Sequence, residues 1–254
     1  MLGLGNTLSG GIVPAVAVYP NTYSVDFDST DDYITMGDNN IFSFGDASTD
    51  SAFSVVAWVK MDDATKFRVL SKSAAATTTV EWFVGTEAND KFSLYLYDNN
   101  TGVQIRASTV ALTSSENTWI HVACTYDGGG ANTGIHLYIN GEDADDSVGV
   151  GGGGDYVAMH NTTAGLEIGR LANASATTYS DGTIDEVSLW DKELSVGEVA
   201  AIWNNGLLTD LSDESGLIGW WRMEEGTGTT VADGSSNSNT GTLTNSPAWS
   251  SDTP

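Results

Sequence analysis

The feature of this sequence that most constrains its fold is a long succession of short segments in which apolar and polar residues alternate. In the segment FSVVAWVKM a period of two residues places the apolar side chains on one face of a strand: Phe53, Val55, Ala57, Val59 and Met61. Clusters of Gly, Asn, Asp and Ser, which form turns, separate this segment from many similar ones. So many short strands predict an all-β sandwich or barrel, and 254 residues suit one such domain.

Two neighbouring segments, TWIHVACTYD and TGIHLYING, predict which side chains face the core. The apolar residues at alternate positions over 120–126 and over 135–139 are expected to point inward. His121, His136 and Tyr138 then share the opposite face of the sheet. One helix is expected at 196–205, because Ser195 and Glu198 form a capping box ahead of an apolar stretch.

The charge balance excludes some partners. The chain has 9 Lys and Arg against 34 Asp and Glu, which gives a formal net charge of -25. Such a surface repels a phosphate backbone and an anionic membrane, so neither nucleic acid nor a membrane is an expected partner. The sequence also lacks a long apolar run and, at its start, the basic region of a standard secretory signal.

Residues 1–21 differ from the rest of the chain, with little periodicity and many glycines. They predict an extended N-terminal arm that docks to a partner, followed by one domain over residues 22–254. The start of the arm, MLGLGNTLSGG, resembles those of small structural proteins of tailed phages.

A set of segments in a fixed order resembles the laminin-G-like, concanavalin A-like jelly-roll family. The segments are SVDFDSTDDYITMGD, FSVVAWVKM, NTWIHVACTYDG with IHLYINGE, and GTIDEVSLWDKELSVGEVAAIW. Departures from the family pattern are small: Ser29 stands where a Gly is usual, and Asn140 where an Asp is usual. The resemblance implies a two-sheet antiparallel jelly-roll sandwich with one short helix.

The C-terminal segment GWWRMEEGTGTTVADGSSNSNTGTLTN resembles the segment that commonly opens such a domain. Either residues 217–248 supply a closing strand of this domain, or a second copy begins here. The first interpretation is preferred, because an orphaned strand would expose Trp220 and Trp221 to solvent.

The resemblance also implies a structural Ca²⁺ between the first acidic turn and the closing strand. The residues that match are Asp28 and Asp185, with Asp32 as a third ligand. Ca²⁺ takes six to eight oxygen ligands, which acidic turns can supply. The alternative stays open that these carboxylates only cap turns by accepting backbone hydrogen bonds.

A glycoside hydrolase on the same fold would need two carboxylates across a cleft. The sequence lacks an E-x-D-x-x-E strand, and the adjacent Asp185 and Glu186 point to opposite faces of a strand. We therefore expect that the protein is not an enzyme and has no catalytic residues.

Sugar-binding sites on such folds use aromatic faces together with polar groups. The candidates are residues expected to point away from the core: Trp82, Tyr95, Tyr97, His121, His136 and Tyr138. The alternative is that each belongs to a covered outer face or to the interface of a homo-oligomer.

Two functions remain open at this point. In the first, the chain is a non-catalytic virion protein, a capsid decoration or fibre component. It lies on the virion surface, contacts other virion proteins through its arm and displays a jelly roll that binds host or environmental glycans. In the second, it is a bacterial extracellular carbohydrate-binding or adhesion module.

Overall fold

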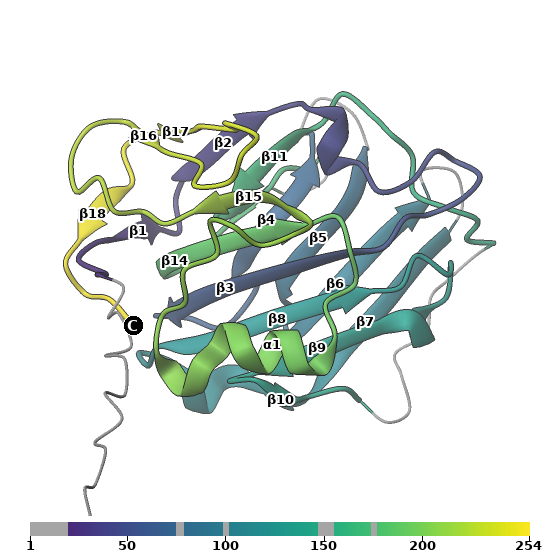
Figure 1. Ribbon diagram of the computed structural model, residues 1–254, viewed down its shortest axis with the longest axis horizontal. Coiled ribbons are helices and arrows are strands. Elements are labelled where there is room, and N and C mark those ends of the chain that lie inside the picture. Colours follow the sequence, from purple (N-terminus) through teal and green to yellow (C-terminus); the bar gives the residue numbers. More distant parts are fainter. Residues whose placement is uncertain (1–19, 75–78, 99–101, 147–154, 174–176) are drawn as a thin grey trace, which may run out of the picture.

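The computed structural model describes residues 20–74, 79–98, 102–146, 155–173 and 177–254. Two antiparallel sheets pack face to face and form a β-sandwich (Figure 1). This confirms the predicted all-β fold with two sheets and one short helix.

The first sheet combines strands from the middle of the chain with strands from near both ends of the chain. Its order is β10 (Glu142–Asp143), β9 (Ile135–Ile139), β8 (Ile120–Tyr126), β3 (Phe53–Met61), β14 (Asp181–Trp190), β1 (Ser24–Asp28) and β18 (Ala248–Ser250). A further strand, β15 (Leu217–Trp221), also pairs with β14.

The second sheet faces the first across the core. Its order is β16 (Thr230–Val231), β17 (Gly241–Thr244), β2 (Tyr33–Gly37), β11 (Gly165–Ile168), β4 (Arg68–Ser73), β5 (Val80–Thr86), β6 (Lys91–Asp98) and β7 (Gly102–Ala111). A short hairpin of β12 (Arg170–Leu171) and β13 (Thr178–Tyr179) lies outside this order.

The core lies between the sheets and is built from alternate positions of their strands. In β8 the side chains of Ile120, Val122, Cys124 and Tyr126 are all buried in it, as their spacing predicts. Large aromatic residues fill the centre, with Phe44 stacked on Phe53 at 4.3 Å between ring centroids. Burial of this apolar surface is the main stabilising contribution to the fold.

The last residues of the chain contribute to both sheets. Strand β15 pairs with β14, β17 pairs with β2, and β18 pairs with β1. Trp221 is fully buried in the core, and Trp220 is buried on the other face of the first sheet. Both tryptophans are thus covered by the same sandwich, and the yellow C-terminal strands lie beside β1 and β2 in Figure 1.

Helix α1 (Val196–Trp203) covers the outer face of the first sheet, in front of β8 and β9 (Figure 1). Ser195 accepts a hydrogen bond from the backbone N–H of Glu198, and the Glu198 carboxylate accepts one from the backbone of Ser195, so the predicted capping box is present. The helix ends at Asn204, which has a left-handed conformation. A 3₁₀ turn, η4 (Asn204–Gly206), accounts for the longer helix expected from the sequence.

Most of the N-terminal arm expected over residues 1–21 lies outside the described residues. Its last two residues contact the domain: the Arg222 guanidinium donates to the carbonyl of Pro20 at 2.7 Å, and the Asn21 amide donates to Asp185 at 2.8 Å.

Within the described ranges, no helix has the length and apolar character needed to cross a membrane.

Candidate functional site

Three aromatic side chains form a row on the outer face of the second sheet. Phe83 of β5 lies directly opposite Tyr95 of β6, and Tyr97 follows on the same face of β6. The rings of Phe83 and Tyr95 stack at 4.5 Å between centroids, and Tyr97 lies 6.2 Å from each of them. We call Phe83, Tyr95 and Tyr97 the aromatic row.

The two tyrosines of the row are only partly covered. Phe83 is buried, whereas Tyr95 and Tyr97 are half-buried. Burial, followed by the nearby Glu87 carboxylate, raises the pKa of each phenol to about 12. Both hydroxyls therefore stay neutral at physiological pH and can donate as well as accept hydrogen bonds.

A buried arginine closes one end of the row. The Arg68 guanidinium lies 4.9 Å from the centroid of the Phe83 ring, which is within cation–π range. Its Nη1 donates to the Glu87 carboxylate at 2.8 Å and to the carbonyl of Thr86 at 2.9 Å. Its Nε donates to Thr178 in β13 at 2.8 Å. These contacts fix the cation and leave the tyrosines as the accessible part of the row.

The β12–β13 hairpin lies beside the row and is anchored on β4. Ser71 donates to the carbonyl of Arg170, and the backbone N–H of Ala172 donates to Ser73. Leu171 of this hairpin is buried with Phe83 and Val80 in a small apolar cluster, against which the two tyrosines pack. Since the rings already stack on one another, the row offers a ligand its ring edges and its two hydroxyls.

The structure brings two of the six predicted ligand-binding residues, Tyr95 and Tyr97, into this site. Trp82 was expected to face outward, and this is wrong: its side chain is fully buried in the core and its indole N–H donates to the carbonyl of Phe42 at 3.0 Å. The pairing of β4 with β5 shifts register next to Lys72, and Trp82 shares the core-facing side of β5 with Val84.

The other three candidates lie on the outer face of the first sheet, far from the aromatic row in the fold. His121 and Tyr138 point away from the core as expected, but the segment that includes α1 covers them, and they are 0% and 3% exposed. Burial lowers the pKa of His121 to about 3, so its ring is neutral and packs edge-on against Trp58. The side chains of His121 and Tyr138 therefore offer little accessible surface to a ligand.

His136 keeps a partly exposed side chain at the edge of this covered face. Its Nδ1 lies 2.8 Å from the Asp145 carboxylate, which also accepts from Arg106 at 3.1 Å. Beside it, a pocket lies between the end of β9 and the start of α1 and is lined by Tyr138, Asp143 and Glu193. His136 thus contacts a carboxylate that also pairs with Arg106, and it lies apart from Tyr95 and Tyr97.

Sequence reasoning missed Phe83 and Arg68. Alternation along VEWFVG shows that Trp82 and Phe83 point to opposite faces, but it does not show which face is the core. The register supplies that information, since Phe83 pairs with Tyr95 and Trp82 with Leu96. Alternation in KFSLYLYD puts Phe92, Leu94 and Leu96 on one face, which indicates that this face is the core and that Tyr95 and Tyr97 point outward.

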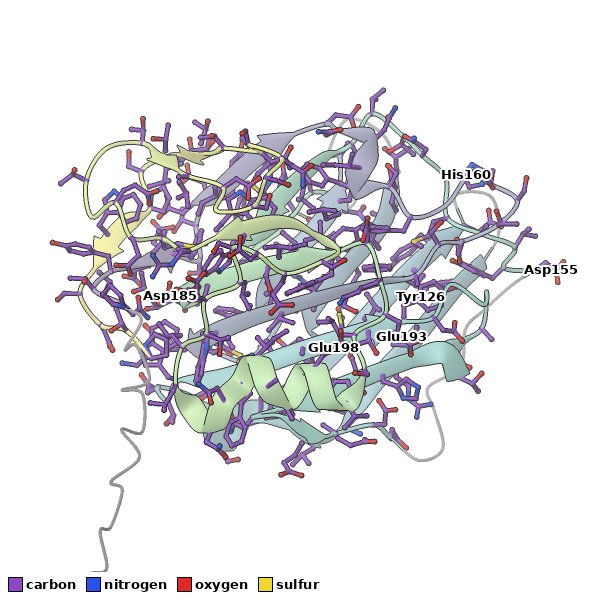
Figure 2. All side chains as sticks on the ribbon, viewed as in Figure 1. Tyr126, Asp155, His160, Asp185, Glu193 and Glu198 are labelled. Carbon is purple, nitrogen blue, oxygen red and sulfur yellow. The ribbon has the colours of Figure 1, made fainter. Side chains whose placement is uncertain are left out.

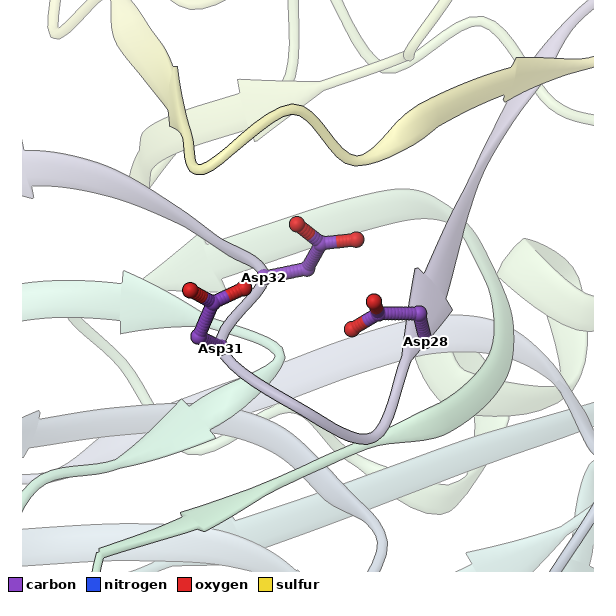
Figure 3. Close-up of side chains that lie close together, drawn as sticks. All are labelled: Asp28, Asp31 and Asp32. Carbon is purple, nitrogen blue, oxygen red and sulfur yellow. The ribbon is translucent and has the colours of Figure 1, made fainter.

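The acidic turn after β1 brings three carboxylates together (Figure 3). Oxygens of Asp28, Asp31 and Asp32 all lie within 4.8 Å of one another. Burial raises the pKa of Asp32, and the negative charges of Asp28 and Asp31 raise it further. Asp28 also accepts a hydrogen bond from the backbone N–H of Thr30 at 2.9 Å, as a turn-capping carboxylate does.

This turn fits a hard divalent cation, because three clustered carboxylates supply oxygen ligands and a cation would relieve their repulsion. Asp185 does not belong to it, and the expected pairing of Asp185 with Asp28 is wrong. Asp28 pairs with Asp181, so Asp185 lies four residues further along β14. Its side chain is fully buried and accepts from Asn21 and from the backbone N–H of Glu186 (Figure 2).

Comparison with known proteins gives one family match. A family model described as the concanavalin A-like lectin/glucanases superfamily matches residues 28–200. Among curated proteins, none matches the chain.

Solved structures match the fold. A candidate carbohydrate-binding protein from Bacteroides ovatus superposes with a TM-score of 0.61 at 19% identity, over 91% of this chain and 60% of that one. The chain thus spans less than two thirds of that protein. The CBM40 module of the Ruminococcus gnavus IT-sialidase, bound to α2,3-sialyllactose, superposes with a TM-score of 0.50 at 12% identity, over 70% of this chain and 95% of that one.

Proposed function

The chain belongs to the concanavalin A-like lectin/glucanases superfamily, and from this premise we propose that it is a non-catalytic carbohydrate-binding module. The binding face is the outer face of the second sheet, around Tyr95 and Tyr97. The observation that carries this proposal is the aromatic row, whose tyrosines stay partly exposed on the side of the sandwich away from α1.

The chemistry of the row suits a sugar. The edges of the two tyrosine rings give a pyranose ring an apolar contact, and their neutral hydroxyls exchange hydrogen bonds with its hydroxyl groups. The Bacteroides ovatus and Ruminococcus gnavus proteins, which share the fold, are described as a candidate carbohydrate binder and a sialyllactose-binding module. Their descriptions agree with a binding role for this chain.

The acidic residues on this face support binding without catalysis. Glu87 is held by Arg68, and Glu167 of β11 forms an ion pair with Arg170. A glycosidase needs one carboxylic acid and one carboxylate free to act on the sugar. Carboxylates held by arginines serve as structural partners instead.

The charge of the protein predicts the class of glycan. A net charge of -25 repels sialylated and uronic-acid glycans at a distance, and Arg68, the cation next to the row, is already paired. We therefore expect neutral glycans to bind better than anionic ones. A glycan array that carries both classes tests this, and binding confined to sialylated glycans would contradict it.

Two settings fit a glycan-binding module, and they remain proposals. In the first, the protein lies on a virion surface and its N-terminal arm binds other virion proteins. This proposal depends on residues that lie mostly outside the described part of the chain. In the second, the protein is an extracellular bacterial module. This proposal depends on the likeness of its fold to that of the Bacteroides ovatus protein. Co-purification of the full chain with virions, compared with a variant lacking residues 1–19, separates the two.

We also propose that Ca²⁺ binds the turn formed by Asp28, Asp31 and Asp32. A cation that binds only the folded state stabilises it, by about 2.7 kcal/mol at a concentration one hundred times its Kd. We expect EDTA to lower the Tm by several degrees and added Ca²⁺ to restore it. Asp32→Asn should abolish this response, and an EDTA-insensitive Tm would exclude the ion.

A further inference from the structure

Lys72 is a fully buried lysine that lies between two carboxylates. Its Nζ lies 2.9 Å from Oδ1 of Asp38 and 3.5 Å from Oε1 of Glu81, and it donates to the carbonyl of Ala164 at 2.6 Å. The side chains of Lys72 and Glu81 are both 0% exposed, whereas that of Asp38 is 35% exposed. An amine is thus held against one carboxyl group at the surface and another in the interior.

Three strands of the second sheet hold this arrangement. Lys72 lies in β4 and Glu81 in β5, and Asp38 follows the last residue of β2. Leu166 of β11 pairs with Gly37 on one side and with Lys72 on the other, so Asp38 and Lys72 flank the same point of β11. Figure 1 shows β2, β11, β4 and β5 in this order.

Glu81 is placed to carry a proton. Burial raises its pKa, while the Lys72 ammonium and hydrogen bonds from Thr162 lower it. Its Oε1 accepts from the backbone and the hydroxyl of Thr162, and its Oε2 is buried with no hydrogen-bond partner among the described residues. A charged pair in such surroundings is costly, so transfer of the Lys72 proton to Glu81 yields a neutral pair.

We propose that Lys72 and Asp38 react to form an intramolecular isopeptide bond, with Glu81 as the proton carrier. Glu81 takes a proton from Nζ, and the neutral amine attacks Cγ of Asp38. The Nζ–Cγ bond forms, the nitrogen gives up a second proton, and one Cγ–O bond breaks. The leaving oxygen takes both protons, one of them returned by Glu81, and departs as water.

The reaction balances without any further reactant. An ammonium and a carboxylate become one amide and one water, and Asp38, at the surface, gives the water a way out. Fixed contact between the amine and the carboxyl group raises their effective concentration. Burial also makes the charged ammonium and carboxylate costly, so formation of the neutral amide is favoured. The product would join β2 to β4 across β11.

A second lysine–aspartate pair in the same protein serves as a control. Lys60 and Asp252 are also in contact, but their side chains are 25% and 49% exposed. An exposed ammonium stays hydrated and charged and is a poor nucleophile. We expect no bond between Lys60 and Asp252.

Mass spectrometry of the intact, denatured protein tests the proposal. The wild-type chain should be lighter than its sequence by one water, trypsin should not cleave after Lys72, and a cross-linked peptide should contain both residues 38 and 72. Asp38→Ala should restore the full mass and the cleavage, and Asp252→Ala should leave the loss of water in place. Asp38→Asn should lose one ammonia instead.

Glu81→Gln tests the proton carrier, since it keeps the shape of the side chain. We expect the full mass with a native circular dichroism spectrum. A wild-type chain of full mass that trypsin cleaves after Lys72 would overturn the proposal, even if variants at the buried positions do not fold. A loss of water that persists in Asp38→Ala would also overturn it, because it would come from another site.

Discussion

The two outer faces of the sandwich both carry aromatic side chains, but only one of them is covered. On the first sheet, α1 and the segment after it bury Tyr138, Trp190 and Trp220 in a second apolar cluster. On the second sheet, Tyr95 and Tyr97 stay half-buried beside a short hairpin. An outward aromatic residue is therefore structural on one face and available to a ligand on the other.

The segment that covers the first sheet is packed against the sheet by apolar side chains. Val199 of α1 and Leu211 of the following segment pack against Trp190 of β14. The capping box fixes the start of α1, and Lys192 pairs with Glu198 at 2.8 Å. Displacing this segment would expose a large apolar surface, so the covered face is poorly suited to reversible ligand binding.

The largest predicted effect concerns this covered face. Trp190 is 1% exposed, and Trp190→Ala should lower the free energy of unfolding by about 3–5 kcal/mol, because it removes buried apolar contacts and leaves a cavity. Urea denaturation measures this. Val196→Ala, at a position 60% exposed on the same helix, should change the stability by less than about 0.5 kcal/mol. Equal effects of the two variants would show that α1 is not a structural cover.

The next effect depends on pH. Burial raises the pKa of Glu186 from 4.5 to about 7, although Arg222 and the Trp220 indole N–H lower it. The folded state then binds a proton that the unfolded state has released, so this group lowers the stability as pH rises from 4.5 to 7. The loss approaches about 3 kcal/mol at 1.36 kcal/mol per pKa unit.

Glu186→Gln should remove that part of the pH dependence. Urea denaturation across the same pH range should show a shallower decline for the variant than for the wild type. Glu198→Gln is a suitable control, because Lys192 and Ser195 lower the pKa of Glu198 to about 2 and it stays ionised throughout. Parallel pH profiles for Glu186→Gln and the wild type would contradict the buried, protonated state of Glu186.

The smallest effect on stability concerns the uncovered face. Tyr97→Ala should cost about 1 kcal/mol, because a half-buried ring loses only part of its apolar contacts. Urea denaturation of Tyr97→Ala and Trp190→Ala under the same conditions compares their free energies of unfolding. A cost for Tyr97→Ala as large as that for Trp190→Ala would mean that the aromatic row is a structural cluster like the covered one.

The sequence predicted the strands and the inward faces because alternation depends on local chemistry. Ile120 and Tyr126 are buried as their spacing predicts, and α1 begins at its capping box. Trp82 and Asp185 were misplaced because their surroundings depend on register, which long-range pairing sets. His121 points outward as predicted, but only the tertiary fold shows that a later segment covers it.

Calorimetric titration of the double variant Tyr95→Ala, Tyr97→Ala measures whether a glycan binds at Tyr95 and Tyr97. Two lost aromatic contacts of about 0.5–1.5 kcal/mol each should together weaken the Kd for a glycan identified on the array by about 5- to 150-fold. Trp119→Ala, at a half-buried tryptophan directly before β8 of the other sheet, should leave the Kd unchanged. Wild-type affinity in a folded double variant would contradict glycan binding at the aromatic row.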